Sequence, residues 1–246
     1  MNWFHKITGF DEQDYAATQS QVTPEQGVTR YESDATQGPA CAVAVGAATI
    51  YRNYLVPVGG GIGQTRGRQI DCLADLGAAL GNEGQRLWRM QNGHAMFSEA
   101  GLAEVDQRLA ALAEPSREEL KGLLRIGTHW NADVTDVAPG HAVSQAFCSA
   151  LPIGYHGRLG ADPRWERIAR IVLEAAYEAT LLAARINHQQ GGSDVVYLTR
   201  IGGGVFRNPL AWIDDAIRLA HERVPGPGVT IVSYGGPDAM LRKLAA

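Results

Sequence analysis

The sequence of 246 residues predicts an α/β fold with a mostly parallel or mixed central sheet and helices on both faces. Three observations predict it. Short apolar runs alternate with long helical patterns, two of these runs lead into glycine-rich loops, and hydrophobic residues make up 45% of the chain. Residues 1–35 are polar and weakly patterned, whereas no linker interrupts the rest. We therefore expect an N-terminal extension over residues 1–35 and one domain over residues 36–246.

Charge and cysteine content exclude several classes of protein. The net charge is −4 and no basic stripe is present, so a nucleic-acid partner is not expected. No run approaches about 18 apolar residues, which argues against a membrane span. Cys41, Cys72 and Cys148 form no CxxC pair and are typical of reduced thiols in a cytoplasmic protein. His129 and Asp133 lack a third ligand at a usable spacing, so no metal site is expected there. No cofactor is expected either.

The first half of the domain is predicted to start with an alanine-rich helix over residues 38–54, with Pro39 in its first turn. A strand over 55–58 then leads into five residues, Gly59-Gly60-Gly61-Ile62-Gly63. Thr65 is placed to cap a following helix, whose inner face would carry Ile70, Leu73, Gly77 and Leu80.

The middle of the chain mixes hairpin, helix and loop patterns. Asn92-Gly93 predicts a hairpin over 87–97, and a helix is expected over 100–113. Ser116 and Glu119 form a capping box for a short helix. The polar stretch 128–136 is interpreted as a loop, and 142–153 is the best strand candidate of the region.

The second half contains the longest helix, over 164–188. Leu173 and Leu181 lie off its apolar stripe, so we expect it to be covered on more than one side; the stripe itself comprises Ile168, Ile171, Val172, Ala175, Ala179, Leu182 and Ile186. A buried strand over 194–201 enters Gly202-Gly203-Gly204, and Asn208 then caps a helix with Pro209 in its first turn. A strand over 229–234 and a short helix close the chain.

Both glycine-rich loops are candidate phosphate sites. Glycines let the backbone approach a ligand, and the amides at a helix N-terminus favour an anion. Two such loops could hold the two phosphates of a diphosphate, while the alternative is a pair of tight turns without ligands. The candidate ligand-binding residues are Gly59, Gly60, Gly61, Ile62, Gly63, Gly202, Gly203, Gly204, Val205, Phe206, Arg207 and Asn208.

Other chemistry has weaker support in the sequence. Neither glycine loop is followed by the Gly-Lys-Ser/Thr of a P-loop, and neither matches the dinucleotide-binding GxGxxG pattern. No GxSxG signature is present, so a serine nucleophile is not indicated. Glu178 lies at the margin of an apolar helix stripe, where it is expected to pair with an arginine such as Arg170 or Arg185 rather than act as a base.

The stretch from Val195 through the 202–206 loop to the strand at 229–234 resembles the end of a macrodomain. In that family the corresponding loop cradles the diphosphate of ADP-ribose, and its aromatic residue, here Phe206, lies by the distal ribose. The 59–63 loop is similar to the family's other glycine-rich loop. Arg207 stands where a glycine is common, and residues 1–35 do not supply the family's first strands, so the resemblance implies a fold lacking those strands.

The whole chain also resembles a bacterial macrodomain-like family that opens with Asn-Trp-Phe and Thr-Gly-Phe, here residues 2–4 and 8–10. The macrodomain resemblance implies binding of ADP-ribose or a related NAD-derived nucleotide, whereas the second resemblance brings no established activity. Hydrolysis of an ADP-ribosyl bond is one hypothesis, with Asn53 and Asp71 as candidate catalytic residues beside the first loop. The alternatives are a non-catalytic reader of the same fold and an interaction protein without a working site, for which an exposed sheet edge favours a homo-oligomer.

Overall fold

The computed structural model describes residues 48, 51, 55–63, 68–91, 93–134 and 140–233. The chain divides into two compact units, each described by itself below. Unit 1 comprises Met1–Asp71 with Met90–His94, and unit 2 comprises Cys72–Arg89 with Ala95–Ala246. The boundary at residue 35, the closing helix and nearly all of the helix expected over 38–54 lie outside the described residues.

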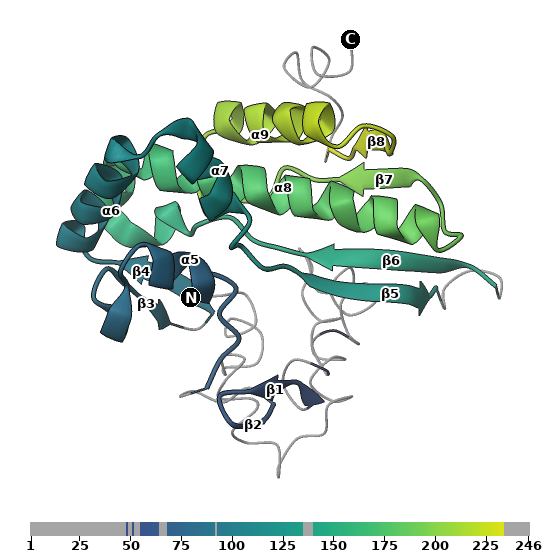
Figure 1. The fold of residues 1–246 in the computed structure, drawn as a ribbon, viewed down its shortest axis with the longest axis horizontal. Coiled ribbons are helices and arrows are strands. Elements are labelled where there is room, and N and C mark those ends of the chain that lie inside the picture. Colours follow the sequence, from purple (N-terminus) through teal and green to yellow (C-terminus); the bar gives the residue numbers. More distant parts are fainter. Residues whose placement is uncertain are drawn as a thin grey trace. The chain divides into compact units, whose positions relative to one another are not determined.

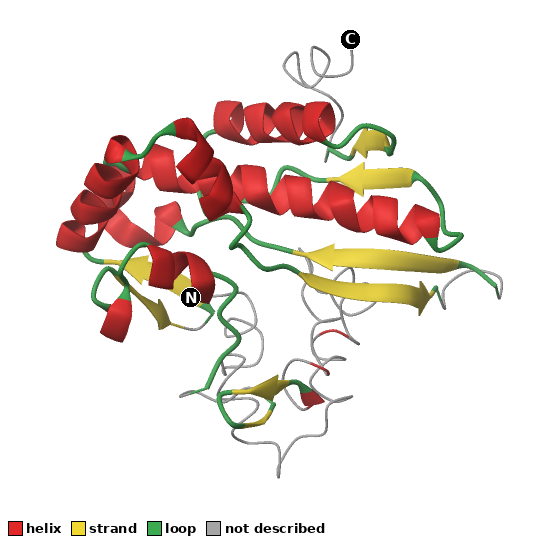
Figure 2. Cartoon of the chain, in the orientation of Figure 1, coloured by secondary structure: helices red, strands yellow, loops and turns green. Residues whose placement is uncertain are grey.

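Helices and short strands alternate along the described chain (Figures 1 and 2). The helices are α5 (Ala74–Ala79), α6 (Glu99–Ala111), α7 (Glu114–Lys121), α8 (Trp165–Gln189) and α9 (Leu210–Arg223), with 3-10 turns η3 (Glu83–Gln85) and η4 (Ile153–Ala161). The strands are β1 (Pro57–Val58), β2 (Gly61–Ile62), β3 (Trp88–Gln91), β4 (His94–Phe97), β5 (Gly127–Asp133), β6 (Ala142–Phe147), β7 (Val195–Leu198) and β8 (Gly228–Ile231).

Within the described residues the strands pair as four two-stranded sheets. β1 pairs with β2 and β5 with β6, both antiparallel, whereas β7 and β8 run parallel, with Val195 opposite Gly228 and Leu198 opposite Ile231. The general α/β class is therefore confirmed. The prediction of a buried strand over 194–201 is wrong in part, because β7 covers only Val195–Leu198 and Val195 and Tyr197 are exposed. A larger central sheet stays a prediction.

The helix expected to start at Thr65 is shorter than predicted. Residues 68–73 are not helical, and α5 begins only at Ala74. Leu73 and Leu80 flank this helix as its N-cap and C-cap residues. Thr65 lies outside the described residues. The periodic spacing of Ile70, Leu73, Gly77 and Leu80 thus overstated the helix, because only its second half is helical.

The middle region confirms the hairpin and corrects the helix caps. β3 pairs with β4 across the predicted turn, and Gly93 has φ 73°. α6 is capped by Ser98, whose Oγ accepts from the Gly101 amide at 2.9 Å. The capping box at Ser116 is wrong, because α7 starts at Glu114 and Ser116 already lies inside the helix. The N-cap residue is Ala113, and a proline lies in the first turn.

The polar stretch 128–133 is a strand rather than a loop. β5 pairs with β6 over most of its length, with a register shift between His129 and Ala132. Asn131 takes up the shift with φ 51°, as a bulge residue can. β6 ends at Phe147, so the predicted strand over 142–153 is too long. Polar content misled the prediction because this hairpin is largely exposed, and exposed strands need few apolar residues.

The longest helix is confirmed and is covered on more than one side. Leu173, Tyr177 and Leu181 are buried against α9, which lies alongside α8 (Figure 1). Trp165, in the first turn, contacts Phe97 edge-on at 5.0 Å between ring centroids. The C-terminal end of the predicted stripe is wrong, since Leu182 and Ile186 are 43% and 44% exposed. Past Tyr177 the buried face follows α9, so Leu181 replaces those two residues in the core.

Candidate functional site

The glycine-rich loop of unit 2, residues Gly202–Asn208, joins β7 to α9 as the sequence predicted and is called the 202–208 loop below. The loop follows β7 and so lies at the carboxyl end of a strand in a parallel pair, the edge at which open α/β sheets bind ligands. The N-cap of α9 is Pro209, which has no capping side chain. The prediction of Asn208 as the cap is therefore wrong.

Two side chains hold the entry of the loop. The Tyr177 hydroxyl donates to the Thr199 carbonyl at 2.7 Å and accepts from the Ile201 amide at 2.9 Å. Burial raises the pKa of Tyr177, so its hydroxyl stays protonated near neutral pH. Arg200 forms a bidentate pair with Asp214 of α9, with both N–O distances at 2.7 Å. The residues just before the loop are thus tied to α8 and α9.

Residues just before η4 and at its start contact the 202–208 loop and hold it in place. Gly202 has φ 76°, and a Cβ there would lie 2.3 Å from the Ala150 Cβ, so only glycine fits. The Gly154 amide donates to the Phe206 carbonyl at 2.9 Å. Asn208 is 2% exposed, and its Nδ2 donates to the Leu151 carbonyl at 2.9 Å. Asn208 therefore anchors the loop through Nδ2, and its contact with a ligand stays a prediction.

The outer edge of the loop is exposed and offers unused donors. No acceptor among the described residues pairs with the amides of Gly204 and Val205, and Val205 is 65% exposed. Arg207 adopts φ 56° and has no acidic partner in the described part of the chain. The Phe206 ring meets the Tyr155 ring edge-on, with centroids 5.3 Å apart. Residues 204–207 thus supply two amides, a guanidinium and an aromatic ring that contacts Tyr155 of η4.

The first glycine loop, in unit 1, has a different structure. Gly59 and Gly60, with φ of 54° and 77°, form the two-residue turn of the β1–β2 hairpin. Arg68 fills its inner side: Nε donates to the Gly63 carbonyl at 3.1 Å and Nη2 to the Ile62 carbonyl at 2.9 Å. The predicted strand–glycine–helix arrangement is wrong here, because the chain returns as a strand. A diphosphate held jointly by both loops stays a prediction.

A catalytic role for the remaining candidates stays a prediction. Asn53 lies outside the described residues, and Asp71 is partly buried at the end of the long segment of unit 1. Glu178 pairs with an arginine, as predicted, but the partner is Arg223 at 3.4 Å. Burial raises the pKa of the Cys148 thiol, which fits a packing role.

Among the described residues, no three His, Cys, Asp or Glu side chains gather as a metal site requires. No helix described here has the length and apolar character of a membrane span.

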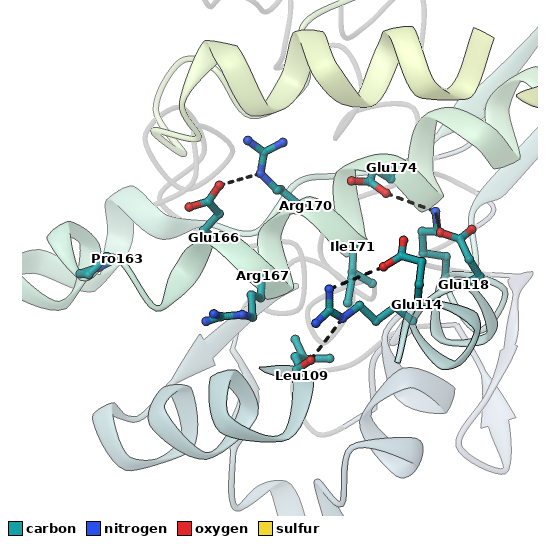
Figure 3. A pocket seen from close by; sticks show the side chains of 11 residues that line it. Leu109, Glu114, Glu118, Pro163, Glu166, Arg167, Arg170, Ile171 and Glu174 are labelled. Atoms are coloured by element: carbon teal, nitrogen blue, oxygen red, sulfur yellow. Dashed lines mark hydrogen bonds and ion pairs between the residues drawn. The ribbon is translucent and has the colours of Figure 1, made fainter. Parts of the chain in front are cut away.

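A charged pocket of about 500 Å³ opens between α6, α7 and α8 of unit 2 (Figure 3). It is lined by Leu109, Glu114, Arg117, Glu118, Lys121, Pro163, Glu166, Arg167, Arg170, Ile171 and Glu174. The sequence reasoning missed it, because residues far apart in the chain line it without any shared motif. The only sequence signal is the three- and four-residue spacing of opposite charges, such as Lys121 with Glu118 and Arg170 with Glu166.

Lys121 is the most buried charge of this pocket, with 5% of its side chain exposed. Its ammonium lies 2.6 Å from Glu118 and 3.2 Å from Glu174, so it joins α7 to α8. Arg223 also binds Glu118 through both carboxylate oxygens. Hydrogen bonding to Arg223 is the main reason why the pKa of Glu118 lies below its ordinary value. These carboxylates are therefore already neutralised by the protein.

Comparisons of the chain with protein-family models, curated proteins and solved structures give no match. Function is therefore inferred from the residues and their geometry.

Proposed function

We propose that the 202–208 loop binds the phosphate groups of ADP-ribose or of a related NAD-derived nucleotide. The observation that carries this proposal is the pair of exposed amides at Gly204 and Val205, which have no acceptor among the described residues. They lie between a parallel strand and the 14-residue helix α9. Adjacent backbone N–H groups ahead of a helix favour an anion, because the helix dipole adds partial positive charge.

The rigidity of the loop supports a binding role. Tyr177, Asn208 and the Gly154 amide hold three separate points of the backbone. A loop fixed before binding loses little conformational entropy when a ligand arrives, so more of the interaction energy is realised as affinity.

Charge and ring chemistry near the amides support a nucleotide rather than a free anion. Arg207 can pair with a phosphate, since no carboxylate of the described residues engages it. Phe206 and Tyr155 provide apolar ring surface for a ribose or base. The resemblance of this stretch to a macrodomain adds ADP-ribose as the first ligand to test, and a macrodomain-like central sheet is part of the same proposal.

Calorimetric titration of the protein with ADP-ribose, with AMP and ATP as controls, tests the proposal. We expect saturable heat with a preference for ADP-ribose. Gly204→Val is expected to weaken binding at least about tenfold, because its side chain would keep a phosphate from approaching the loop amides. The new Cβ meets nothing within 4 Å, so the fold should persist.

Gly127→Val in β5 is the matched control, because its Cβ makes only an ordinary contact with Phe147. A folded wild-type protein that gives no heat with ADP-ribose would refute the proposal. Release of product from an ADP-ribosylated substrate would distinguish a hydrolase from a reader, because both bind but only the first turns over.

A further inference from the structure

We infer that the pocket between α6, α7 and α8 is a second binding site, separate from the 202–208 loop, for a small organic oxyanion. The ligand class is a carboxylate or phosphomonoester attached to an apolar body. The inference rests on the donors, the neutralised acids and the apolar lining of this pocket, and it does not depend on ADP-ribose binding.

The donors come from two arginines on different helices. Arg117 of α7 donates from Nε to the Leu109 carbonyl at 3.3 Å, and its nearest acid, Glu114, is 3.6 Å away. Arg167 of α8 uses one nitrogen, Nη1, for Asp106. A guanidinium carries five N–H groups, so both retain several donors. Their side chains are 36% and 48% exposed, which leaves these donors accessible.

Both arginines line the pocket. The bond to the Leu109 carbonyl places the Arg117 guanidinium beside Leu109. Figure 3 shows Arg167 apart from Glu118 and Glu174, with its side chain directed away from them. Two arginines with spare donors that line one pocket are suited to an oxyanion, because a guanidinium can donate to it in a bidentate manner.

The acids of the pocket do not prevent anion binding. Glu118 and Glu174 form ion pairs with Lys121, and Glu166 forms an ion pair with Arg170 at 2.8 Å. Glu114 is 70% exposed at the rim, where water screens its charge. An incoming anion therefore meets two arginines with spare donors and acids that are already paired.

The size and lining of the pocket indicate that the anion has a carbon skeleton. About 500 Å³ exceeds the volume of an inorganic anion and lies within the range of metabolite sites. Leu109, Ile171 and Pro163 supply apolar surface next to the arginines. An apolar body on this surface would add hydrophobic burial to the charge-assisted bonds.

Benzoate, phenyl phosphate and benzamide are suitable probes, because they share one ring and differ in the polar group. We expect saturable binding of one or both anions in calorimetry and none of neutral benzamide; the stronger anion identifies the headgroup. Arg117→Gln and Arg167→Gln should each weaken binding about tenfold or more, whereas the exposed Arg185→Gln on α8 should not.

A second measurement uses the wild-type chain and avoids any folding defect. Phenylglyoxal modifies accessible arginines, and the bound anion should protect Arg117 and Arg167 but not Arg185, as followed by peptide mass spectrometry. Gly204→Val should leave probe binding intact, which separates this site from the 202–208 loop. Absence of saturable binding of both anions, or affinities unchanged in both pocket variants, would overturn the inference.

Discussion

Two runs of three glycines in this chain form different local structures, one a hairpin turn and the other a loop between a strand and a helix. Gly59–Gly61 belongs to an antiparallel hairpin whose inner side is filled by Arg68. Gly202–Gly204 belongs to a parallel strand–loop–helix unit whose outer edge is open. Each run is followed by a β-branched apolar residue, Ile62 in one case and Val205 in the other. A glycine run alone therefore does not identify a phosphate site.

The difference lies in what the chain does after the glycines. At 59–63 the next residues return along β1, so the turn's amides and carbonyls serve the hairpin. At 202–208 the chain continues into α9, which buries Ile213 and Ile217 against α8 and cannot return along β7. The loop amides are left without strand partners for that reason. Whether the loop amides keep free donors therefore depends on what the segment after the glycines packs against, and not on the glycines themselves.

The largest expected effect comes from alanine at matched positive-φ glycines of the two loops. Gly202→Ala adds left-handed strain and a clash with Ala150, and should cost about 3 kcal/mol or more in unfolding free energy. Gly60→Ala adds strain only, since nothing lies within 4 Å, and should cost about 1 kcal/mol. Urea denaturation measures both. Equal losses would show that the 202–208 loop is no more tightly packed than the hairpin turn.

A smaller effect is expected from the side chain that holds the entry of the 202–208 loop. Tyr177→Phe removes the hydroxyl that bonds to Thr199 and Ile201, leaving both backbone groups unpaired, and should cost about 1–3 kcal/mol. Tyr197→Phe is the control, because Tyr197 is 70% exposed and its change should stay within about 0.5 kcal/mol. Thermal unfolding of the two variants provides the test. An unchanged unfolding temperature for Tyr177→Phe would mean that the loop does not need this anchor.

The smallest effect concerns pH and the η4 segment that supports the 202–208 loop. His156 Nε2 accepts from the Phe97 amide at 2.9 Å, so its Nδ1 carries the proton and donates to the Pro152 carbonyl. Burial holds the pKa of His156 below 6.5 in the folded protein. The unfolded chain therefore binds a proton at higher pH, and stability should fall as pH drops below about 6.5.

His156→Gln should remove this part of the pH dependence, whereas the hairpin at 59–63 has no such group among its described contacts. Urea denaturation of both proteins between pH 5 and pH 8, a range chosen about the ordinary histidine pKa, measures the difference. Parallel curves for wild type and variant would show that His156 titrates alike in the folded and unfolded states.

Sequence alone determined the elements whose pattern is long or whose turn is specific. The helix over 164–188, the Asn92-Gly93 hairpin and the strand–glycine–helix order at 195–223 follow from periodicity and local turn chemistry. Tertiary structure decided the rest, because it depends on partners distant in the chain. Only packing shows that Asn208 is a buried anchor, that Arg68 fills the first loop, and that Arg117 and Arg167 share one pocket. Those contacts join residues with no common local pattern, so the sequence carries no short-range signal for them.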